Sequence, residues 1–243
     1  MQPRQKRTRG YPVALLIGLE DDAAYIWQVF SRAIKPMTSV HLCTDRGDQK
    51  ALYNFYESVI NKMRQIIREG VRSIIISSQP KNNYFQDLIN HIDRHHAWLK
   101  QGENKIMVTA ITGSAATHSQ VAQLAKSLAF RKIVKETASE EAGDLIDLLE
   151  KHLNTSNEAN VILFSIDETE DAVLRLPRTG IRKTEYLILT DKYLNGSKQK
   201  NRLNRLFQIA TNKGVKTRVI ESESPAGQRI AQLGGIVYIT MKE

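Results

Sequence analysis

The chain contains 243 residues, of which 41% are hydrophobic, and its mean hydropathy of -0.38 is typical of a globular protein. No apolar run approaches the roughly 20 residues of a membrane-spanning helix, and the basic N-terminus lacks the apolar core of a signal peptide. The single cysteine, Cys43, excludes an internal disulfide, and its strand-like surroundings predict a small buried side chain. We therefore expect a cytoplasmic protein without a membrane partner.

The charge of the chain favours a polyanionic partner, because the formal net charge is +9 and the pI is about 9.6. Arg4, Lys6, Arg7 and Arg9 crowd the first ten positions without an acid, and residues 192–218 hold eight Lys or Arg and no Asp or Glu. A solvated tail and an ordinary polar helix face are the alternative. Two acid-free basic segments favour nucleic acid, through contacts with phosphates.

The first part of the chain predicts an arm followed by strands. Residues 1–11 are expected to form a disordered basic arm. Apolar runs at 13–18 and 23–31 flank an acidic turn and predict a hairpin. Pro36 is expected to break the chain, and a third strand is expected at 39–43.

A long helix is predicted from 51 to 67. Asp48 can cap its first turn, because a carboxylate accepts from amides that lack a helical partner. Gly70 is expected to end it, because glycine tolerates positive φ. The apolar residues at helical spacing are Leu52, Phe55, Tyr56, Val59, Ile60, Met63, Ile66 and Ile67.

Strands and helices then alternate. The patterns predict strands at 71–77 and 105–111, a helix that begins at 80–82, and a helix at 118–128. A strand, a helix and a strand in succession imply a parallel pair with a crossover helix. We therefore predict an α/β domain with a mixed sheet over residues 12–136.

The second part of the chain predicts a smaller domain. Residues 137–140 resemble a helix start, and the helix is expected to reach Leu153, so we place the domain boundary at 135–139. Residues 137–243 are then expected to form an α/β/α sandwich. The alternating elements are strands at 161–164, 186–190, 217–221 and 236–240, and helices at 168–176, 198–212 and 225–233.

Several segments resemble those of a known family. They are YLILTDKYL at 186–194, KTRVIESESPAGQRIAQLGGIVYIT at 216–240, and the segments 50–67, 71–80 and 112–153. Their order and spacing resemble the central and C-terminal domains shared by Pelota proteins and the class-1 release factors of archaea and eukaryotes. The resemblance covers nearly the whole chain.

The resemblance implies a role on the ribosome. Both families carry an additional N-terminal domain that enters the decoding site, whereas only residues 1–11 precede the central-like domain here. The implied function is therefore that of a Pelota-like factor in rescue or recycling of stalled ribosomes, without reading of stop codons. The implied partners are the large ribosomal subunit, tRNA or rRNA, a translational GTPase and the ribosome-splitting ATPase.

The loop before the long helix is the candidate for catalysis. Release factors hydrolyse peptidyl-tRNA with a Gly-Gly-Gln loop, and Gly47, Asp48 and Gln49 fall at a similar place. Gln49 could position water beside a backbone that Gly47 leaves accessible, as in a codon-independent peptidyl-tRNA hydrolase. Asp48, however, replaces the second glycine, and its carboxylate would oppose the developing oxyanion. We therefore favour a helix cap over an enzyme.

Basic residues supply the candidate RNA contacts. Besides the four in the arm, Arg46 and Lys50 flank the loop, while Lys198, Arg202 and Arg205 follow one face of a predicted helix. Such a stripe can track an RNA backbone, and an ordinary soluble surface is the equal alternative. A third possible function is a simple RNA-binding module, because the second domain resembles a fold related to kink-turn-binding ribosomal proteins.

Histidines on one predicted helix are the candidate metal ligands. His91 and His95 share a face, and two histidines four residues apart can bind zinc. No glutamate follows His91 as in HExxH, and no third ligand is evident, so we interpret these histidines and His96 as part of a solvated face. The sequence also lacks a glycine-rich phosphate-binding motif. We therefore predict no metal and no cofactor.

Overall fold

The computed structural model describes residues 11–102, 105–154, 160–176 and 185–241. The arm predicted over residues 1–11 lies outside this part of the chain except for Tyr11, whose carbonyl accepts a hydrogen bond from the Ser31 amide at 2.9 Å. None of the described helices combines the length and the apolar character that crossing a membrane requires.

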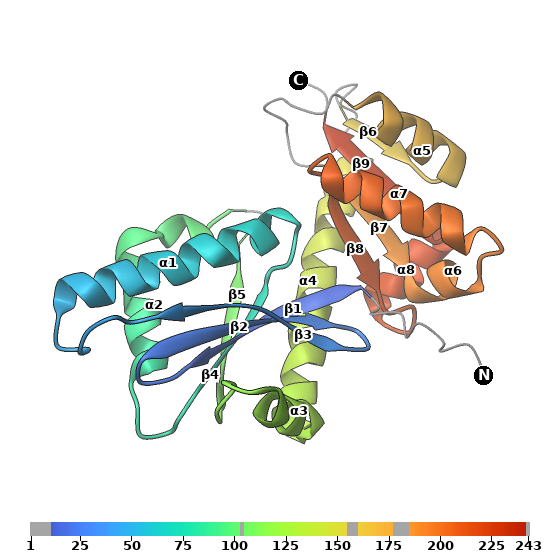
Figure 1. Cartoon of the computed structure of the whole chain (residues 1–243). Helices are drawn as coiled ribbons and strands as arrows, with labels where there is room; N and C mark the ends of the chain where they lie inside the picture. The colour runs from blue at the N-terminus through green and yellow to red at the C-terminus, as the bar shows by residue number, and fades with distance from the viewer. Residues whose placement is uncertain (1–10, 103–104, 155–159, 177–184, 242–243) are drawn as a thin grey trace, which may run out of the picture. The chain divides into compact units, whose positions relative to one another are not determined.

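Packing divides the chain into two compact units, which separate between Thr137 and Ala138, and Arg68–Gly70 group with the second unit. Each unit has its own β-sheet with helices packed against it (Figure 1). The predicted α/β fold class, a mixed-sheet unit followed by a sandwich, is thereby confirmed. The assignment of residues 12–136 and 137–243 to two family domains stays a prediction.

The first sheet is mixed because a hairpin region adjoins a parallel region. β1 (Pro12–Leu19) pairs antiparallel with β2 (Ala23–Phe30), which pairs antiparallel with β3 (Ile34–His41). On its other side β1 pairs parallel with β4 (Ser73–Ser78), and β4 pairs parallel with β5 (Met107–Thr112). The strand order is β3-β2-β1-β4-β5, and the interior strands β1 and β4 are almost wholly buried, as in sheets covered on both faces.

Helices cover both faces of this sheet (Figure 1). α1 (Gln49–Arg68) and α2 (Tyr84–His95) pack on one face, and a 3₁₀ turn, η1 (Ala97–Lys100), follows α2. α3 (His118–Lys126) and the first part of α4 (Leu128–Asn154) pack on the other face. The sheet therefore lies between two helical layers.

α1 has the predicted apolar face. Its buried residues are Phe55, Tyr56, Val59, Ile60, Met63 and Ile66, and Leu52 and Ile67 pack at the margin. Each such side chain contributes about 1.5–3 kcal/mol when it leaves water. Gly70 ends the helix as predicted, because its φ of 101° lies in the left-handed region and lets the Val71 amide donate to the Ile66 carbonyl at 3.2 Å.

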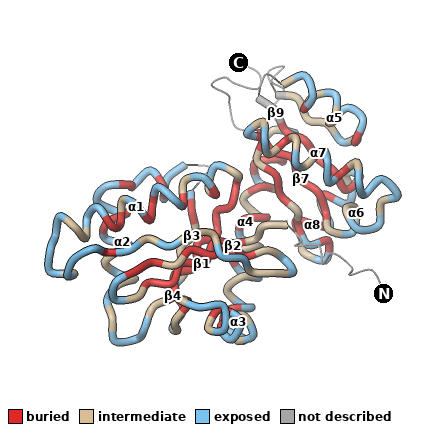
Figure 2. The backbone as a smooth tube through the Cα atoms, viewed as in Figure 1, coloured by how far each residue is buried: buried red, intermediate tan, exposed pale blue. Residues whose placement is uncertain are grey.

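The second sheet has the order β6-β9-β7-β8. β7 (Tyr186–Thr190) pairs parallel with β8 (Lys216–Ile220) and antiparallel with β9 (Ile236–Met241). β6 (Asn160–Leu163) pairs antiparallel with β9 at the edge. The central strands β7 and β9 are buried, and they are among the red segments of this unit in Figure 2.

Helices enclose this sheet as the sandwich requires. α8 (Pro225–Gln232) and the second part of α4 pack on one face. α5 (Ile166–Arg175) and α7 (Lys200–Asn212) pack on the other face. A short helix, α6 (Asp191–Gly196), follows β7 directly and was not predicted from the sequence.

The predicted start of a helix at residues 137–140 is wrong. The structure has one continuous helix, α4, from Leu128 to Asn154. The Thr137 hydroxyl, expected to face free amides at a helix start, instead donates back to the Ile133 carbonyl at 2.8 Å. Threonine can satisfy its hydroxyl in this way inside a helix, so the sequence pattern of a cap does not require an end there.

Two predictions around β3 are also wrong. Pro36 does not break the chain but lies within β3, opposite Trp27, where the pairing register shifts. β3 is the edge strand of its sheet, and an edge tolerates a residue that cannot donate to a ladder. β3 ends at His41, so Cys43 lies beyond the strand and is exposed rather than buried.

Asp191, at the start of α6, has a carboxylate oxygen that accepts several hydrogen bonds. One oxygen of Asp191 accepts from the amides of Ser222 and Lys192, both at 2.8 Å, and from the Ser222 hydroxyl. Partial burial opposes ionisation, but the bonds from Ser222 and Lys192 outweigh it and lower the pKa of Asp191 below its ordinary value. The carboxylate therefore joins the end of β7 to the segment after β8.

We expect Asp191→Asn to lower the free energy of unfolding by about 1 kcal/mol at neutral pH, because the charged acceptor is lost. Since the folded pKa is depressed, the difference should be full above pH about 4 and should disappear as the pH falls through the folded value. Urea unfolding from pH 7 to pH 3 measures it. Asp171→Asn, at an exposed position of α5, is the matched control, and an equal or pH-independent loss in the two variants would contradict the assignment.

Candidate functional site

Several strands of the first sheet have their carboxyl ends at the same edge of that sheet. β1, β3, β4 and β5 run in the same direction, so their carboxyl ends meet at this edge. The edge carries Glu20, the loop from Leu42 to Asp48, and Ser114, whose hydroxyl donates to the Glu20 carboxylate. The Leu42 amide donates to the Asp22 carbonyl at 2.7 Å and ties the loop to the turn after β1. In open α/β sheets this is the edge at which ligands bind.

Arg46 holds the loop in place. Its Nε donates to the Asp21 carbonyl at 2.8 Å, and its Nη2 donates to the Glu20 carbonyl at 2.6 Å. Its guanidinium carbon lies 3.5 Å from the centroid of the Tyr84 ring, a cation–π contact. Partial burial and the hydrogen bond that Tyr84 donates to Asp21 raise the pKa of Tyr84, so its hydroxyl stays protonated.

These contacts give Arg46 a structural role inside the protein. The prediction that Arg46 contacts RNA would require a phosphate to displace two carbonyl acceptors that are already in place. Lys50, the second residue of α1, differs because its side chain is exposed and has no polar partner among the described residues.

Asp48 caps α1 as predicted. Its Oδ1 accepts from the amides of Lys50 at 3.0 Å and Ala51 at 3.1 Å, and its carbonyl accepts from the Leu52 amide at 2.9 Å. The amides of Lys50 and Ala51 belong to the first turn and have no backbone partner within the helix, whereas the bond from Leu52 is the first of the helical series. The carboxylate also lies at the positive end of the helix dipole.

The two candidate catalytic residues lie on either side of this cap. Gly47 is exposed and its φ is not positive, and a Cβ added there would meet nothing within 4 Å, so its backbone does not need a glycine. Gln49 is the exposed first residue of α1, and its amide forms no hydrogen bond with the described side chains. The loop thus presents Gln49 to solvent next in sequence to the Asp48 carboxylate that caps the helix.

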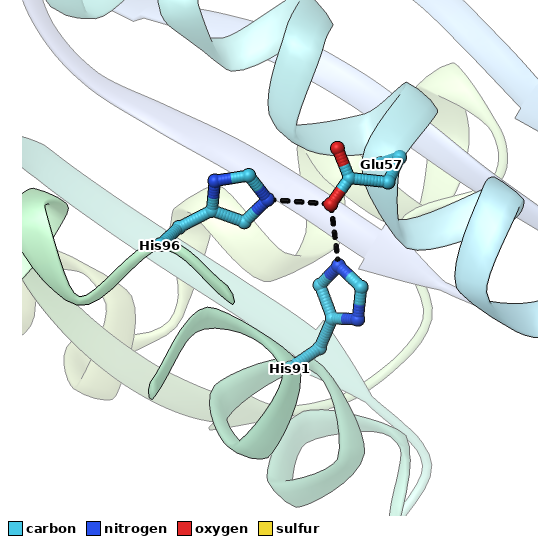
Figure 3. A group of neighbouring side chains, drawn as sticks. All are labelled: Glu57, His91 and His96. Atoms are coloured by element: carbon cyan, nitrogen blue, oxygen red, sulfur yellow. Dashed lines mark hydrogen bonds and ion pairs between the residues drawn. The ribbon is translucent and has the colours of Figure 1, made fainter. Parts of the chain in front are cut away.

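A cluster of three polar side chains lies between α1 and α2, and the sequence did not predict it. Glu57 of α1 points toward His91 of α2 and toward His96, which follows that helix (Figure 3). A single oxygen, Oε1, lies 3.0 Å from Nε2 of His91 and 2.6 Å from Nε2 of His96. Both imidazoles are buried, so the predicted solvated face is wrong for them, whereas His95 is exposed as expected.

The end of α2 explains why His96 rather than His95 joins His91. On a continuous helix, residues five apart would lie about 140° apart around the axis. α2 ends at His95, and His96 has φ -136° and ψ 36°, so the chain turns and brings its ring back. The third group, Glu57, comes from a helix more than 30 residues earlier, a proximity that the local pattern around the histidines does not contain.

Hydrogen bonding sets the charges of this group. Partial burial opposes ionisation of Glu57, but the bonds from His96 and His91 outweigh it and hold the pKa of Glu57 below its ordinary value. Burial lowers the pKa of His91, and the nearby carboxylate offsets only part of this effect. At neutral pH the carboxylate is therefore ionised and His91 is neutral. Two imidazoles and a carboxylate form a donor set that can hold a divalent metal ion.

The fold pairs part of the basic segment at residues 192–218 with acids and other acceptors. Arg202 pairs with Asp167 and Glu170, each at 2.5 Å, and Lys213 donates to three carbonyls at the end of α5. Lys192 and Arg218 also pair with acids from other parts of the chain. The sequence showed no acid because these partners lie far away along the chain.

Not all residues of the predicted basic stripe, Lys198, Arg202 and Arg205, are therefore available to bind RNA from one helix face. α7 begins at Lys200 rather than at Lys198, so Lys198 lies outside the helix, and Arg202 is held in ion pairs. Lys198 and Arg205 are exposed and have no polar partner among the described residues. The four basic residues predicted as RNA contacts in the arm lie outside the described part of the chain.

No family model matches the chain. Among curated proteins, the chain is 24% identical over 234 residues to the protein pelota homolog of Methanocaldococcus jannaschii, an alignment that covers 93% of this chain. The chain spans 60% of the length of that relative.

Two solved structures share the fold. Dom34 of S. cerevisiae, a translation termination-like factor, matches 98% of this chain with a TM-score of 0.52 and 17% identity, over 66% of its own length. Archaeal Pelota, solved in a ribosome-bound form with ABCE1, matches 100% of this chain with a TM-score of 0.55 and 14% identity, over 64% of its own length. The resemblance to Pelota predicted from the sequence is therefore confirmed, by an archaeal relative in sequence and by Pelota and Dom34 in fold.

Proposed function

We propose that the protein is a Pelota-like, ribosome-associated translation factor that acts in rescue or recycling of stalled ribosomes without reading stop codons. The observation that carries this proposal is the shared fold, which extends over 98% of the chain for Dom34 and over all of it for ribosome-bound archaeal Pelota. The match to these two proteins extends over both units of the chain. We therefore infer for this chain an activity that uses both units together.

The partners follow from the same two proteins. Dom34 is described as interacting with Hbs1, and archaeal Pelota as bound to the ribosome with ABCE1. For this chain we infer the large ribosomal subunit, tRNA or rRNA, a translational GTPase and the ribosome-splitting ATPase. A cytoplasmic location is part of the same proposal.

The geometry of the loop supports a factor that does not hydrolyse peptidyl-tRNA. The Asp48 carboxylate is tied to two amides of α1 and lies next to Gln49. In a desolvated site a carboxylate at this place would oppose the negative charge that develops during ester hydrolysis. Its capping bonds also keep it from swinging away without cost to the helix.

The free basic residues support a contact with phosphates. Lys50, Lys198 and Arg205 are exposed, and the arm adds Arg4, Lys6, Arg7 and Arg9. Arg46 and Arg202 contribute less to this proposal, because their guanidinium groups are already bound within the protein.

We expect binding to ribosomes to weaken steeply with salt, because each phosphate contact releases counterions. Lys198→Gln with Arg205→Gln should reduce the slope of log affinity against log salt by roughly 1.4 to 1.8, at about 0.7 to 0.9 per contact. Deletion of residues 2–9 should weaken binding and lower the slope as well. Sedimentation with purified ribosomes and subunits over a salt series measures both effects.

Lys35→Gln with Lys62→Gln is the matched control, because it removes the same charge from exposed positions of the first unit. Binding that does not depend on salt, or that changes equally in the control, would contradict phosphate contacts through Lys198 and Arg205. Equal affinity for ribosomes and for unrelated free RNA would instead indicate a simple RNA-binding module.

The loop separates a binding factor from an enzyme. We expect Gln49→Ala to change neither ribosome binding nor release of nascent chains from peptidyl-tRNA on large subunits. Asp48→Ala should lower the free energy of unfolding by about 1 kcal/mol through loss of the cap, and Asp48→Ser, which can still cap, should lower it less. Release assays and urea unfolding of the same proteins provide the two measurements.

A hydrolase would behave in the opposite way. The unmodified protein would release nascent chains, Gln49→Ala would abolish release, and Asp48→Gly would accelerate it by removing a charge that opposes the oxyanion. That set of results would overturn the proposal of a non-hydrolytic factor while leaving ribosome binding in place.

A further inference from the structure

Glu57, His91 and His96 bring three metal-binding atoms together. The Oε1 atom of Glu57 and one ring nitrogen from each histidine all lie within 4.8 Å of one another. The ligands come from α1 and from the end of α2, which pack on the same face of the first sheet (Figure 3).

We propose that these three residues form a zinc site, with Oε1 of Glu57 and Nε2 of His91 and His96 as ligands. Two imidazoles with one carboxylate are a common zinc donor set. Tetrahedral bonds of about 2.0–2.2 Å place ligand atoms about 3.3 Å apart. The observed separations between Oε1 and the two nitrogens are 3.0 and 2.6 Å, and all three ligand atoms lie within 4.8 Å of one another, so the side chains must readjust around the ion.

The burial of the ligands leaves one position for water. The histidine side chains are 7% exposed, whereas that of Glu57 is 25% exposed, so solvent reaches the group from the side of Glu57. Three protein ligands and an open fourth position are typical of zinc sites that bind water or a further ligand. The ion would also connect α1 to the end of α2.

Arg64 opposes the ion. Its Nη2 lies 3.5 Å from Nδ1 of His96, so a positive charge already stands beside the site. Zinc takes the lone pair of Nε2, which places the imidazole proton on Nδ1, where it would face the Arg64 donor. Arg64 must therefore turn away from Nδ1 of His96. Its guanidinium carbon already lies 5.5 Å from the centroid of the Trp98 ring, a contact that it can keep as it does so.

Without an ion the group is a closed set of hydrogen bonds, in which both histidines donate to one carboxylate oxygen. The ion-free and zinc-bound states differ in how Arg64 interacts with His96. In the ion-free state Arg64 can donate to Nδ1 of His96, and in the zinc-bound state it is repelled. Arg64→Met, which keeps an apolar chain and removes the charge, should therefore favour zinc.

Zinc titration of the full chain, freed of any histidine tag and of bound metal, tests the site by calorimetry. We expect one zinc ion per chain, and a weaker affinity by more than roughly tenfold in Glu57→Gln and in His96→Ala. His95→Ala is the matched control, because His95 is exposed on the same helix and is not a ligand, and it should bind as the unmodified protein does. Arg64→Met should bind several-fold more tightly.

Two further measurements keep the test independent of folding. Zinc should raise the thermal midpoint of the unmodified protein and of His95→Ala, but not that of Glu57→Gln. Cobalt in place of zinc should give the intense visible absorption of a tetrahedral ion. Absence of saturable binding, equal loss in His95→Ala and His96→Ala, or weaker binding in Arg64→Met would overturn the proposal.

Discussion

The connection between β3 and α1 depends on one guanidinium group. Arg46 donates to the carbonyls of Glu20 and Asp21 and stacks on Tyr84, so it joins the turn after β1, the loop and the start of α2. With the loop held there, Asp48 can cap α1. The start of α1 then determines where every later residue of that helix faces, including the carboxylate that meets the two histidines.

Much of the fold could be predicted because its signals are local. The apolar face of α1, the buried β-branched strand at 73–78 and the turn at Gly70 each depend on residues close together in sequence. The errors arise where one local sequence pattern is compatible with more than one structure. Thr137 resembles a cap but finds a carbonyl within its own helix. Pro36 resembles a break but lies on an edge strand, where its missing donor costs little.

The candidate site was predicted only in its local part. The role of Asp48 follows from its position before an apolar periodic segment, and the structure agrees. The partnership of Glu57 with His91 and His96 could not be predicted, because it needs the packing of two helices and the end of α2. The positive charge that is free to bind a partner was overestimated for the same reason. The acids that neutralise Arg202 lie in α5, far from it in the sequence.

Hydrogen exchange around the loop in Arg46→Lys tests the role of Arg46 most directly, because lysine keeps the charge but cannot bind two carbonyls and stack at once. We predict faster exchange of the amides at residues 42, 48 and 50–52, while those of β7 keep their rates. Arg32→Lys, at an exposed position before β3, is the control. Unchanged exchange at the loop, or equal acceleration in both units, would contradict the central role of Arg46.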